Sequence, residues 1–464
     1  MVPKRYFLHA SGFDPYDAAA QYRRFVREVA RFAATWNLKA QVSAIHQSGA
    51  PDSHWTVTTQ APDWQVVTVF ELLDWSDIVR GELKRPSGRR LAEGLATFAE
   101  FIWSGTARRY FTANWRYGMF FLVPFLNVFL FAAVAILVAQ YIGTAVAAAL
   151  TSTLWGVAGA VAAAALVFAA LMRWPGERWR VPQALADWIF ARDYMRGRHP
   201  EMNARIEAFV ARVVACARRS DAEEIVIAGH SLGAMVAVDV LARAFDRDPA
   251  LGRHGPKLCL LTVGATIPKL ALHPRGAWLR ESVRRLAAEP SLTWAEYQAR
   301  DDFISFHKFD PVKLARVDDR PPPCPPPLAG EGREGVGGPI IRRVQIHQML
   351  SAPTLRRLHF AYMRLHYQFV MANERRAAYD YFMLMCGPAP FRRTVTQPNG
   401  PAGLYGADGA YAAPSPPAGS AGVPLLPLPY PPPPAGEGRV GGAAGETTAL
   451  PGEGREGAAA VDPP

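Results

Sequence analysis

A stretch of 56 residues without one charged side chain constrains the fold of this chain more than any other feature. No Asp, Glu, Lys or Arg occurs in residues 117–172. A helix needs about 20 apolar residues to cross a bilayer, so one helix of this length would be far too long. The stretch therefore predicts two membrane spans, at roughly 118–141 and 147–171, joined by a turn near Gly143 and Thr144.

Arginines flank the charge-free stretch on both sides. They are Arg108, Arg109 and Arg116 before it, and Arg173, Arg178 and Arg180 after it. The positive-inside rule places both flanks, and the soluble parts that they join, on the cytoplasmic side of the inner membrane. These arginines would also attract anionic headgroups. Small residues in the second span, at Gly156, Gly159 and Ala163, would let the two helices approach closely.

The net charge and the spacing of the cysteines limit the partners, cofactors and cellular compartment that we expect. The formal net charge is +11, yet the arginines are spread along the chain and no nucleic-acid-binding module accompanies them. We therefore expect a membrane as partner and no nucleic acid. The four cysteines are widely spaced, which fits a reducing compartment and predicts no metal site, and no other cofactor is expected. The N-terminus lacks the apolar core of a cleaved signal peptide, and the oligomeric state is left open.

Short β-branched runs alternate with helical patterns along most of the chain. The predicted strands are 5–10, 40–45, 54–59, 65–72, 224–229 and 257–265, with weaker ones at 301–309 and 340–348. The predicted helices are 17–35, segments within 76–110, 183–219, 232–245 and 355–385. This alternation predicts an α/β fold with a mostly parallel, doubly wound sheet that carries helices on both faces.

The predicted organisation interrupts this α/β domain with the hairpin. Residues 1–110 form its first half, 111–180 the transmembrane hairpin, and 181–390 its second half. Two Pro/Gly-rich segments, 320–338 and 413–464, share a repeated GEGR word and cannot bury enough apolar area to fold. The first is expected to be a low-complexity insert, and residues 391–464 a disordered C-terminal tail.

One five-residue motif carries chemistry. Residues 229–233, Gly-His-Ser-Leu-Gly, match the G-x-S-x-G nucleophile elbow, with a strand pattern before them and a helix pattern after them. The glycines remove side chains where strand and helix pass close to the turn, so that Ser231 is presented at the sheet edge. The backbone N–H of Leu232, at the helix N-terminus, would stabilise an oxyanion. An unreactive tight turn is the alternative interpretation.

The segment 225–242, IVIAGHSLGAMVAVDVLA, resembles the elbow of lipases and esterases of the α/β-hydrolase superfamily. The resemblance implies a triad in the chain order serine, acid, histidine. It also implies a second oxyanion N–H from a loop after an early strand. The loop at residues 9–15 stands at that place but has Ser-Gly-Phe instead of the usual HG-type sequence, so the N–H of Gly12 or Phe13 is the candidate.

The acid and the histidine are chosen by their order along the chain after Ser231. Asp302 is favoured as the acid because an apolar run follows it directly, with Asp301 as the alternative and Asp310 next in the chain. His366 is favoured as the base over His359. The remaining histidine that follows in order, His347, lies inside a strand pattern. His230 is interpreted as a neighbour of the pocket that points away from the direction Ser231 takes.

These residues predict a membrane-anchored serine hydrolase. Ser231 would attack an ester or thioester carbonyl, His366 would take its proton, and Asp302 would orient the imidazole. Water, or another acceptor, would then release the acyl group. A lipid or acyl-ester substrate is the hypothesis, since the hairpin would bring the pocket near a lipid pool. The alternative is a catalytically inactive hydrolase-like membrane scaffold that recruits partners.

Overall fold

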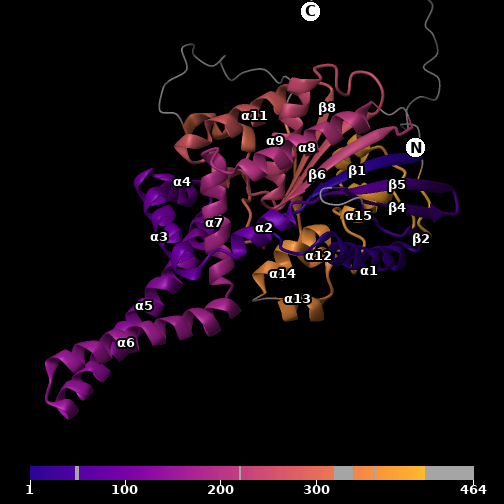
Figure 1. Cartoon of the computed structure of the whole chain (residues 1–464). Helices are drawn as coiled ribbons and strands as arrows, with labels where there is room; N and C mark the ends of the chain where they lie inside the picture. Colours follow the sequence, from indigo (N-terminus) through magenta and orange to yellow (C-terminus); the bar gives the residue numbers. More distant parts are fainter. Residues whose placement is uncertain (48–51, 219–220, 318–337, 359–360, 413–464) are drawn as a thin grey trace, which may run out of the picture. The chain divides into compact units, whose positions relative to one another are not determined.

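A mixed, mostly parallel sheet forms the centre of the protein (Figure 1). The computed structural model describes residues 1–47, 52–218, 221–317, 338–358 and 361–412. The strands are Lys4–Ala10 (β1), Lys39–Val42 (β2), His46–Gln47 (β3), Asp52–Ala61 (β4), Trp64–Leu73 (β5), Glu224–His230 (β6), Lys257–Val263 (β7), Leu292–Ala299 (β8) and Ile340–Val344 (β9). They are ordered β2-β4-β5-β1-β6-β7-β8-β9, with β3 paired to β4. From β5 to β9 all neighbours are parallel, which confirms the predicted sheet type.

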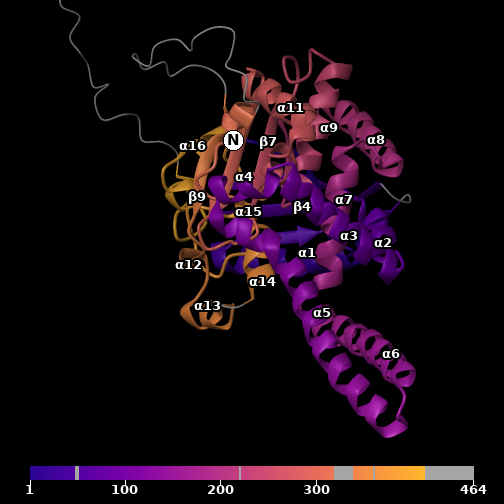
Figure 2. The same cartoon turned by 90° about the vertical axis from the view of Figure 1, so that its left-hand side faces the viewer.

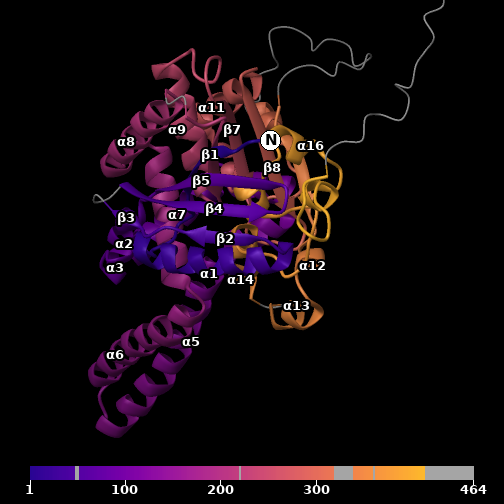
Figure 3. The ribbon, with the colours of Figure 1, turned by 90° about the vertical axis from the view of Figure 1, so that its right-hand side faces the viewer.

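The central strands are buried on both faces. In β1, Tyr6 and Leu8 belong to one hydrophobic cluster, whereas Phe7 between them belongs to the other. Because side chains alternate along a strand, these clusters lie on opposite sides of the sheet. Helices cover both: α9 packs on the Tyr6 side and α1 on the Phe7 side. The antiparallel end, with β2 and β4, runs beside α1 (Figure 3).

The helices follow the predicted segments, with some breaks. The α-helices are Ala18–Trp36 (α1), Ser76–Leu83 (α2), Ser87–Trp103 (α3), Thr106–Ala113 (α4), Trp115–Leu150 (α5), Thr153–Leu171 (α6), Val181–Met195 (α7), Pro200–Ala217 (α8), Gly233–Arg247 (α9), Ile267–Ala271 (α10), Ala277–Ala288 (α11), Ile346–Met349 (α12), Ala352–Leu358 (α13), Tyr362–Tyr367 (α14), Tyr381–Cys386 (α15) and Phe391–Thr396 (α16). The helix expected at 183–219 is two helices, because Gly197 adopts a φ of 68° and Pro200 begins α8.

The charge-free stretch forms two long antiparallel helices, α5 and α6, that extend away from the sheet (Figures 1 and 2). Both are long and apolar enough to cross a membrane. The first turns of α5 pack into the domain core through Tyr117, Phe121 and Phe125. By contrast, α6 buries only Gly156.

The turn of this hairpin lies later than the sequence predicts. Gly143 and Thr144 are inside α5, and the chain reverses at Thr151, whose φ is 45°. A Cβ on Gly143 would lie 2.8 Å from the Ala160 Cβ, and one on Gly156 would lie 2.6 Å from the Ala147 Cβ. The glycine at 143 therefore serves helix contact and not chain reversal, as does Gly156, for which the sequence predicts this role.

Four further predictions about the second half need correction. The strand expected at 301–309 is an irregular segment, and the strand lies just before it, at Leu292–Ala299. The strand expected at 340–348 ends at Val344, and the helix expected at 355–385 is three short helices. The tail predicted from 391 begins too early, because Phe391 and Val395 of α16 are fully buried. Residues 413–464, and the insert at 320–338 apart from Gly338, lie outside the described residues.

Candidate active site

Ser231, the predicted nucleophile, lies at the bend between β6 and α9. Its φ of 57° falls in the left-handed region, which a residue with a Cβ seldom adopts. A Cβ on Gly229 would lie 2.5 Å from the Ala234 Cα, and one on Gly233 would lie 2.1 Å from the Ala10 carbonyl oxygen. Both glycines thus permit the close approach that a nucleophile elbow needs, and Ser231 stands at the carboxyl end of β6.

Backbone hydrogen bonds to neighbouring segments of the same chain hold this bend. The Ser231 N–H donates to the Val263 carbonyl oxygen at the end of β7, over 3.2 Å. The Thr266 N–H, in the loop after β7, donates to the Ser231 carbonyl oxygen over 3.3 Å. The strained conformation of Ser231 is therefore fixed by a strand and a loop outside the motif.

His366 and Asp302, the favoured histidine and acid, form a buried pair. The distance from His366 Nδ1 to Asp302 Oδ2 is 2.7 Å, and the two residues are 1% and 2% exposed. The Ile304 N–H donates to the other carboxylate oxygen, Asp302 Oδ1, over 2.9 Å. A carboxylate at Nδ1 keeps the ring proton on that nitrogen, which leaves Nε2 as a proton acceptor.

His366 Nε2 is the atom that would receive the serine proton. It is buried and has no hydrogen-bond partner among the described residues. His366 and Ser231 line one cavity. A Cβ on Gly264, which follows β7, would lie 3.2 Å from the His366 Cε1, so the ring packs closely on that loop. The structure thus brings Ser231, His366 and Asp302 to one site.

The alternative residues lie elsewhere. Asp301 is exposed, although it precedes Asp302 directly. Asp310 accepts a hydrogen bond from the Val312 N–H over 3.0 Å at the start of the short helix Pro311–Val317. His347 is exposed on α12. His359 lies outside the described residues.

His230 supports the site from behind. It is 2% exposed, and its Nε2 lies 3.1 Å from the His366 carbonyl oxygen. The two imidazole rings are 4.6 Å apart between centroids. Burial, together with the nearby His366 and His9, holds the pKa of His230 well below its usual value, so His230 is neutral and donates to that carbonyl. It therefore positions the segment that carries His366.

The loop after β1 places backbone N–H groups beside Ser231. A Cβ on Gly12 would lie 2.9 Å from the Ser231 Cβ and 3.4 Å from the Ser231 Oγ, so the Gly12 backbone touches the serine. The N–H groups of Gly12, Phe13 and Leu232 donate to no other described residue, and all three residues line the cavity. The Trp75 Nε1–H donates to the Ser11 carbonyl oxygen over 3.0 Å and fixes the loop. The predicted oxyanion donors are thus next to Ser231.

The cavity has a volume of about 430 Å³, within the range of small-molecule sites. Two of its walls come from segments that the sequence does not connect with Ser231. The first turns of α5 supply mostly apolar side chains, and the start of α7 supplies the polar Gln183 and Asp187 together with Val181 and Ala184. On the polar side, Lys269 Nζ lies 2.5 Å from Asp187 Oδ2 and 4.1 Å from the centroid of the Trp188 ring.

Two hydroxyl groups in this cavity were not expected from the sequence. Thr266 Oγ1 and Tyr117 Oη are buried and have no hydrogen-bond partner among the described residues. A buried hydroxyl without a partner is costly, so each is a candidate contact for a ligand. Thr266 directly follows the predicted strand at 257–265, at the sheet edge where α/β proteins bind ligands, and this was the one signal available for it. Tyr117 opens the charge-free stretch and gave no signal.

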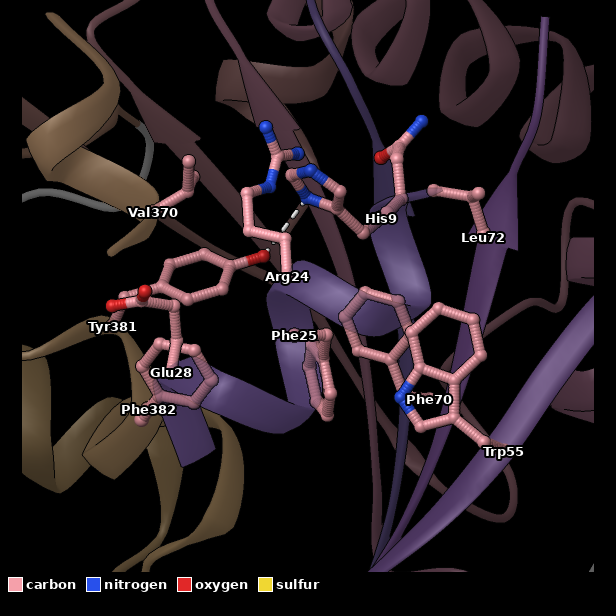
Figure 4. A pocket seen from close by; sticks show the side chains of 11 residues that line it. His9, Arg24, Phe25, Glu28, Trp55, Phe70, Leu72, Val370, Tyr381 and Phe382 are labelled. Carbon is pink, nitrogen blue, oxygen red and sulfur yellow. Dashed lines mark hydrogen bonds between the residues drawn. The ribbon is translucent and has the colours of Figure 1, made fainter. Parts of the chain in front are cut away.

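A second, smaller cavity is lined by side chains of α1, of strands β1, β4 and β5, and of the C-terminal part of the domain (Figure 4). Its volume of about 30 Å³ is enough for a single water molecule. The Tyr381 hydroxyl and His9 Nδ1 are 2.8 Å apart in its wall, and Arg24 and Glu28 of α1 line it as well. Burial, followed by the charge of Arg24, lowers the pKa of His9 to about 3. This cavity is too small for a substrate, and we interpret it as part of the structural support.

Within the residues that the structure describes, no group of three or more His, Cys, Asp or Glu side chains is placed to hold a metal ion. Compared with protein-family models, curated proteins and solved structures, the chain gives no match. The function is therefore inferred from the residues and geometry of the site alone.

Proposed function

We propose that this protein is a membrane-anchored serine hydrolase of the α/β-hydrolase type, which cleaves an ester or thioester through an acyl-enzyme. The observation that carries the proposal is the buried Asp302–His366 pair in the same cavity as a strained Ser231. An exposed turn serine would need neither the pair nor the strain. The arrangement matches the roles of a Ser-His-Asp triad, which is recognised by geometry and not by sequence position.

The chemistry follows from the positions of the atoms. His366 Nε2 takes the proton of the Ser231 hydroxyl while the serine oxygen bonds to the carbonyl carbon. The carbonyl oxygen becomes negative and accepts hydrogen bonds from the N–H groups of Leu232 and of Gly12 or Phe13. The bond to the alcohol or thiol then breaks, and His366 returns the proton to that leaving group. A water molecule repeats the sequence on the acyl-enzyme and releases the acid.

The membrane part of the proposal rests on the exposure of the hairpin. Leu154 and Leu166 of α6 are 75% and 72% exposed, and such a run of apolar side chains is unstable in water. The 19 residues of α6 span about 28 Å, close to the thickness of a bilayer core. Both ends of the hairpin return to the α/β domain, so the positive-inside rule assigns that domain to the cytoplasmic face.

Labelling with a fluorophosphonate probe tests the enzyme. The full-length protein in detergent should react at Ser231, and the Ser231→Ala variant should not. Hydrolysis of a short acyl ester should disappear in the same variant while its circular dichroism stays unchanged. A wild-type protein that takes up no probe, or a Ser231→Ala variant with full esterase activity, would refute the proposal and favour the inactive scaffold.

A further inference from the structure

The cavity beside Ser231 is walled by the same helix that reaches into the predicted membrane region. Six residues from the start of α5 line it: Tyr117, Met119, Phe120, Val123, Pro124 and Asn127. Beyond Asn127, α5 continues for about 35 Å to Leu150, enough to cross a bilayer core. The first part of α5 therefore lines the substrate cavity, and the next part of the same helix is long enough to span the membrane.

The cavity is polar at one end of this helical wall and apolar at the other. Tyr117 stands at the domain end, and Thr266 and the Lys269–Asp187 pair lie on the cavity wall contributed by the domain. Val123 and Pro124 stand about 10 Å further along the helix. The side-chain amide of Asn127 donates to the Val123 carbonyl oxygen over 2.9 Å, so this polar group is already occupied. An ester group fits beside Ser231, and a hydrocarbon chain fits along the far part of α5.

The far end of the cavity lies where α5 leaves the domain core after Val128, later than the start of the span that the sequence predicts at about residue 118. Trp179 lines the cavity, and its ring centroid lies 5.8 Å from that of Phe131, one turn beyond Asn127 on α5. Trp174 is 80% exposed, and Trp179 is also exposed. Exposed tryptophans beside arginines are typical of the interface between lipid and water. A chain lying along α5 would therefore pass from the cavity into the bilayer without crossing water.

We infer that the substrate is a membrane-resident long-chain acyl ester, which enters from the bilayer with its hydrocarbon chain along residues 119–127 of α5. This inference rests on the proposed hydrolase function. It assigns α5 a role in substrate binding in addition to anchoring. The wall that carries Lys269 fits an ester, because this buried cation is neutralised by Asp187.

A matched pair of α5 variants tests this path. Val123 lines the cavity and is 48% exposed, whereas Leu126 is 52% exposed on the same part of the helix but does not line the cavity. Val123→Trp fills the proposed chain path, and Leu126→Trp adds a similar side chain outside it. Each protein, reconstituted in phosphatidylcholine vesicles, is assayed with p-nitrophenyl palmitate and p-nitrophenyl butyrate. Val123→Ala, which widens the path, is the second variant if Val123→Trp fails to fold.

The expected result is a change in chain-length preference alone. In Val123→Trp, the ratio of kcat/KM for palmitate to that for butyrate should fall about tenfold or more, the scale of discrimination in an apolar pocket. In Leu126→Trp the ratio and the labelling by a short fluorophosphonate should stay as in the wild type, and labelling of Val123→Trp serves only to show that its site is still folded. Normal labelling with an unchanged ratio in Val123→Trp and Val123→Ala overturns the chain path only. No labelling of the wild-type protein overturns both the path and the proposed hydrolase.

Discussion

His366 Nδ1 lies 2.7 Å from Asp302 Oδ2, and this hydrogen bond joins two buried side chains that are 64 residues apart in the chain. The Asp302 carboxylate is itself held by the Ile304 N–H. The bond therefore fixes the position of the His366 ring and the nitrogen that carries its proton. The opposite ring nitrogen has no partner among the described residues, and His366 lines the same cavity as Ser231.

The Asp302→Asn variant should fold normally but lose the correct orientation of the His366 imidazole. The amide would present the wrong hydrogen-bonding group to Nδ1, and kcat should fall by about 10³–10⁴-fold, as in other triads. Asp301→Asn is the matched control, because Asp301 is the exposed neighbour. Ester hydrolysis and circular dichroism of both variants give the answer. Equal activities in the two variants would show that the Asp302–His366 bond has no part in the reaction.

Gly12→Ala should disable the site by crowding it. The new Cβ would stand 2.9 Å from the Ser231 Cβ, closer than side chains pack, so the serine or the loop must move. A displacement of this size next to the reacting atom should lower kcat by about 10²-fold. Gly88→Ala is the control, because a Cβ there meets nothing within 4 Å. The rate of fluorophosphonate labelling measures the effect, and a Gly12→Ala protein that labels as fast as Gly88→Ala contradicts it.

The parts of the fold that the sequence predicts are those with strong local patterns. Strands β1, β5 and β6 have β-branched or apolar runs, and residues 229–233 form a recognisable motif, although Gly233 makes its close contact with Ala10 of β1. Strand β8 was not predicted from the sequence, because Glu296 and Gln298 are polar residues of the kind that is common in loops. When buried, the two side chains satisfy each other, since the Gln298 amide donates to Glu296 Oε1 over 2.6 Å. Burial raises the pKa of Glu296 to about 7. Such mutual satisfaction of polar groups cannot be recognised in a hydropathy pattern.

The candidate site likewise has a part that the sequence predicts and a part that it does not. Ser231, Asp302 and His366 follow from the motif and the order of elements. The wall supplied by α5 does not, because it depends on the packing of α5 against α4 and α7, which brings it to the cavity of Ser231, more than 100 residues later in the chain. The same limit explains the misplaced hairpin turn. Gly143 is a turn residue by composition, but its position is set by contact with Ala160 of the partner helix.

Acid should destabilise the protein through His9. Its folded pKa of about 3 lies below the ordinary 6.5, so below pH 6.5 the unfolded chain binds a proton that the folded protein does not. The stability contribution is complete above pH 6.5 and is lost as the pH falls toward 3. His9→Gln keeps an acceptor for the Tyr381 hydroxyl but does not titrate. Relative to this variant, the wild-type free energy of unfolding should fall by about 3 kcal/mol from pH 7.5 to pH 4. Parallel pH profiles would contradict the assignment.

Gly143→Leu should open the helical hairpin. A Cβ at this position would lie 2.8 Å from the Ala160 Cβ and 2.9 Å from the Gly156 carbonyl oxygen, so the larger side chain forces α5 and α6 apart. A disulfide reports the separation, because a Cβ on Gly159 would lie 3.5 Å from the Val146 Cβ, within the range that a disulfide needs.

The test therefore uses proteins that carry Val146→Cys and Gly159→Cys in vesicles. Oxidation should cross-link the two cysteines efficiently in this background and in the one that also carries Ala145→Leu, whose added side chain lies on an exposed position of α5. Adding Gly143→Leu should reduce cross-linking strongly, while fluorophosphonate labelling of Ser231 persists because the first turns of α5 are held in the domain core by Tyr117 and Phe121. If Gly143→Leu and Ala145→Leu cross-link equally well, the close approach at residue 143 does not hold the two helices together.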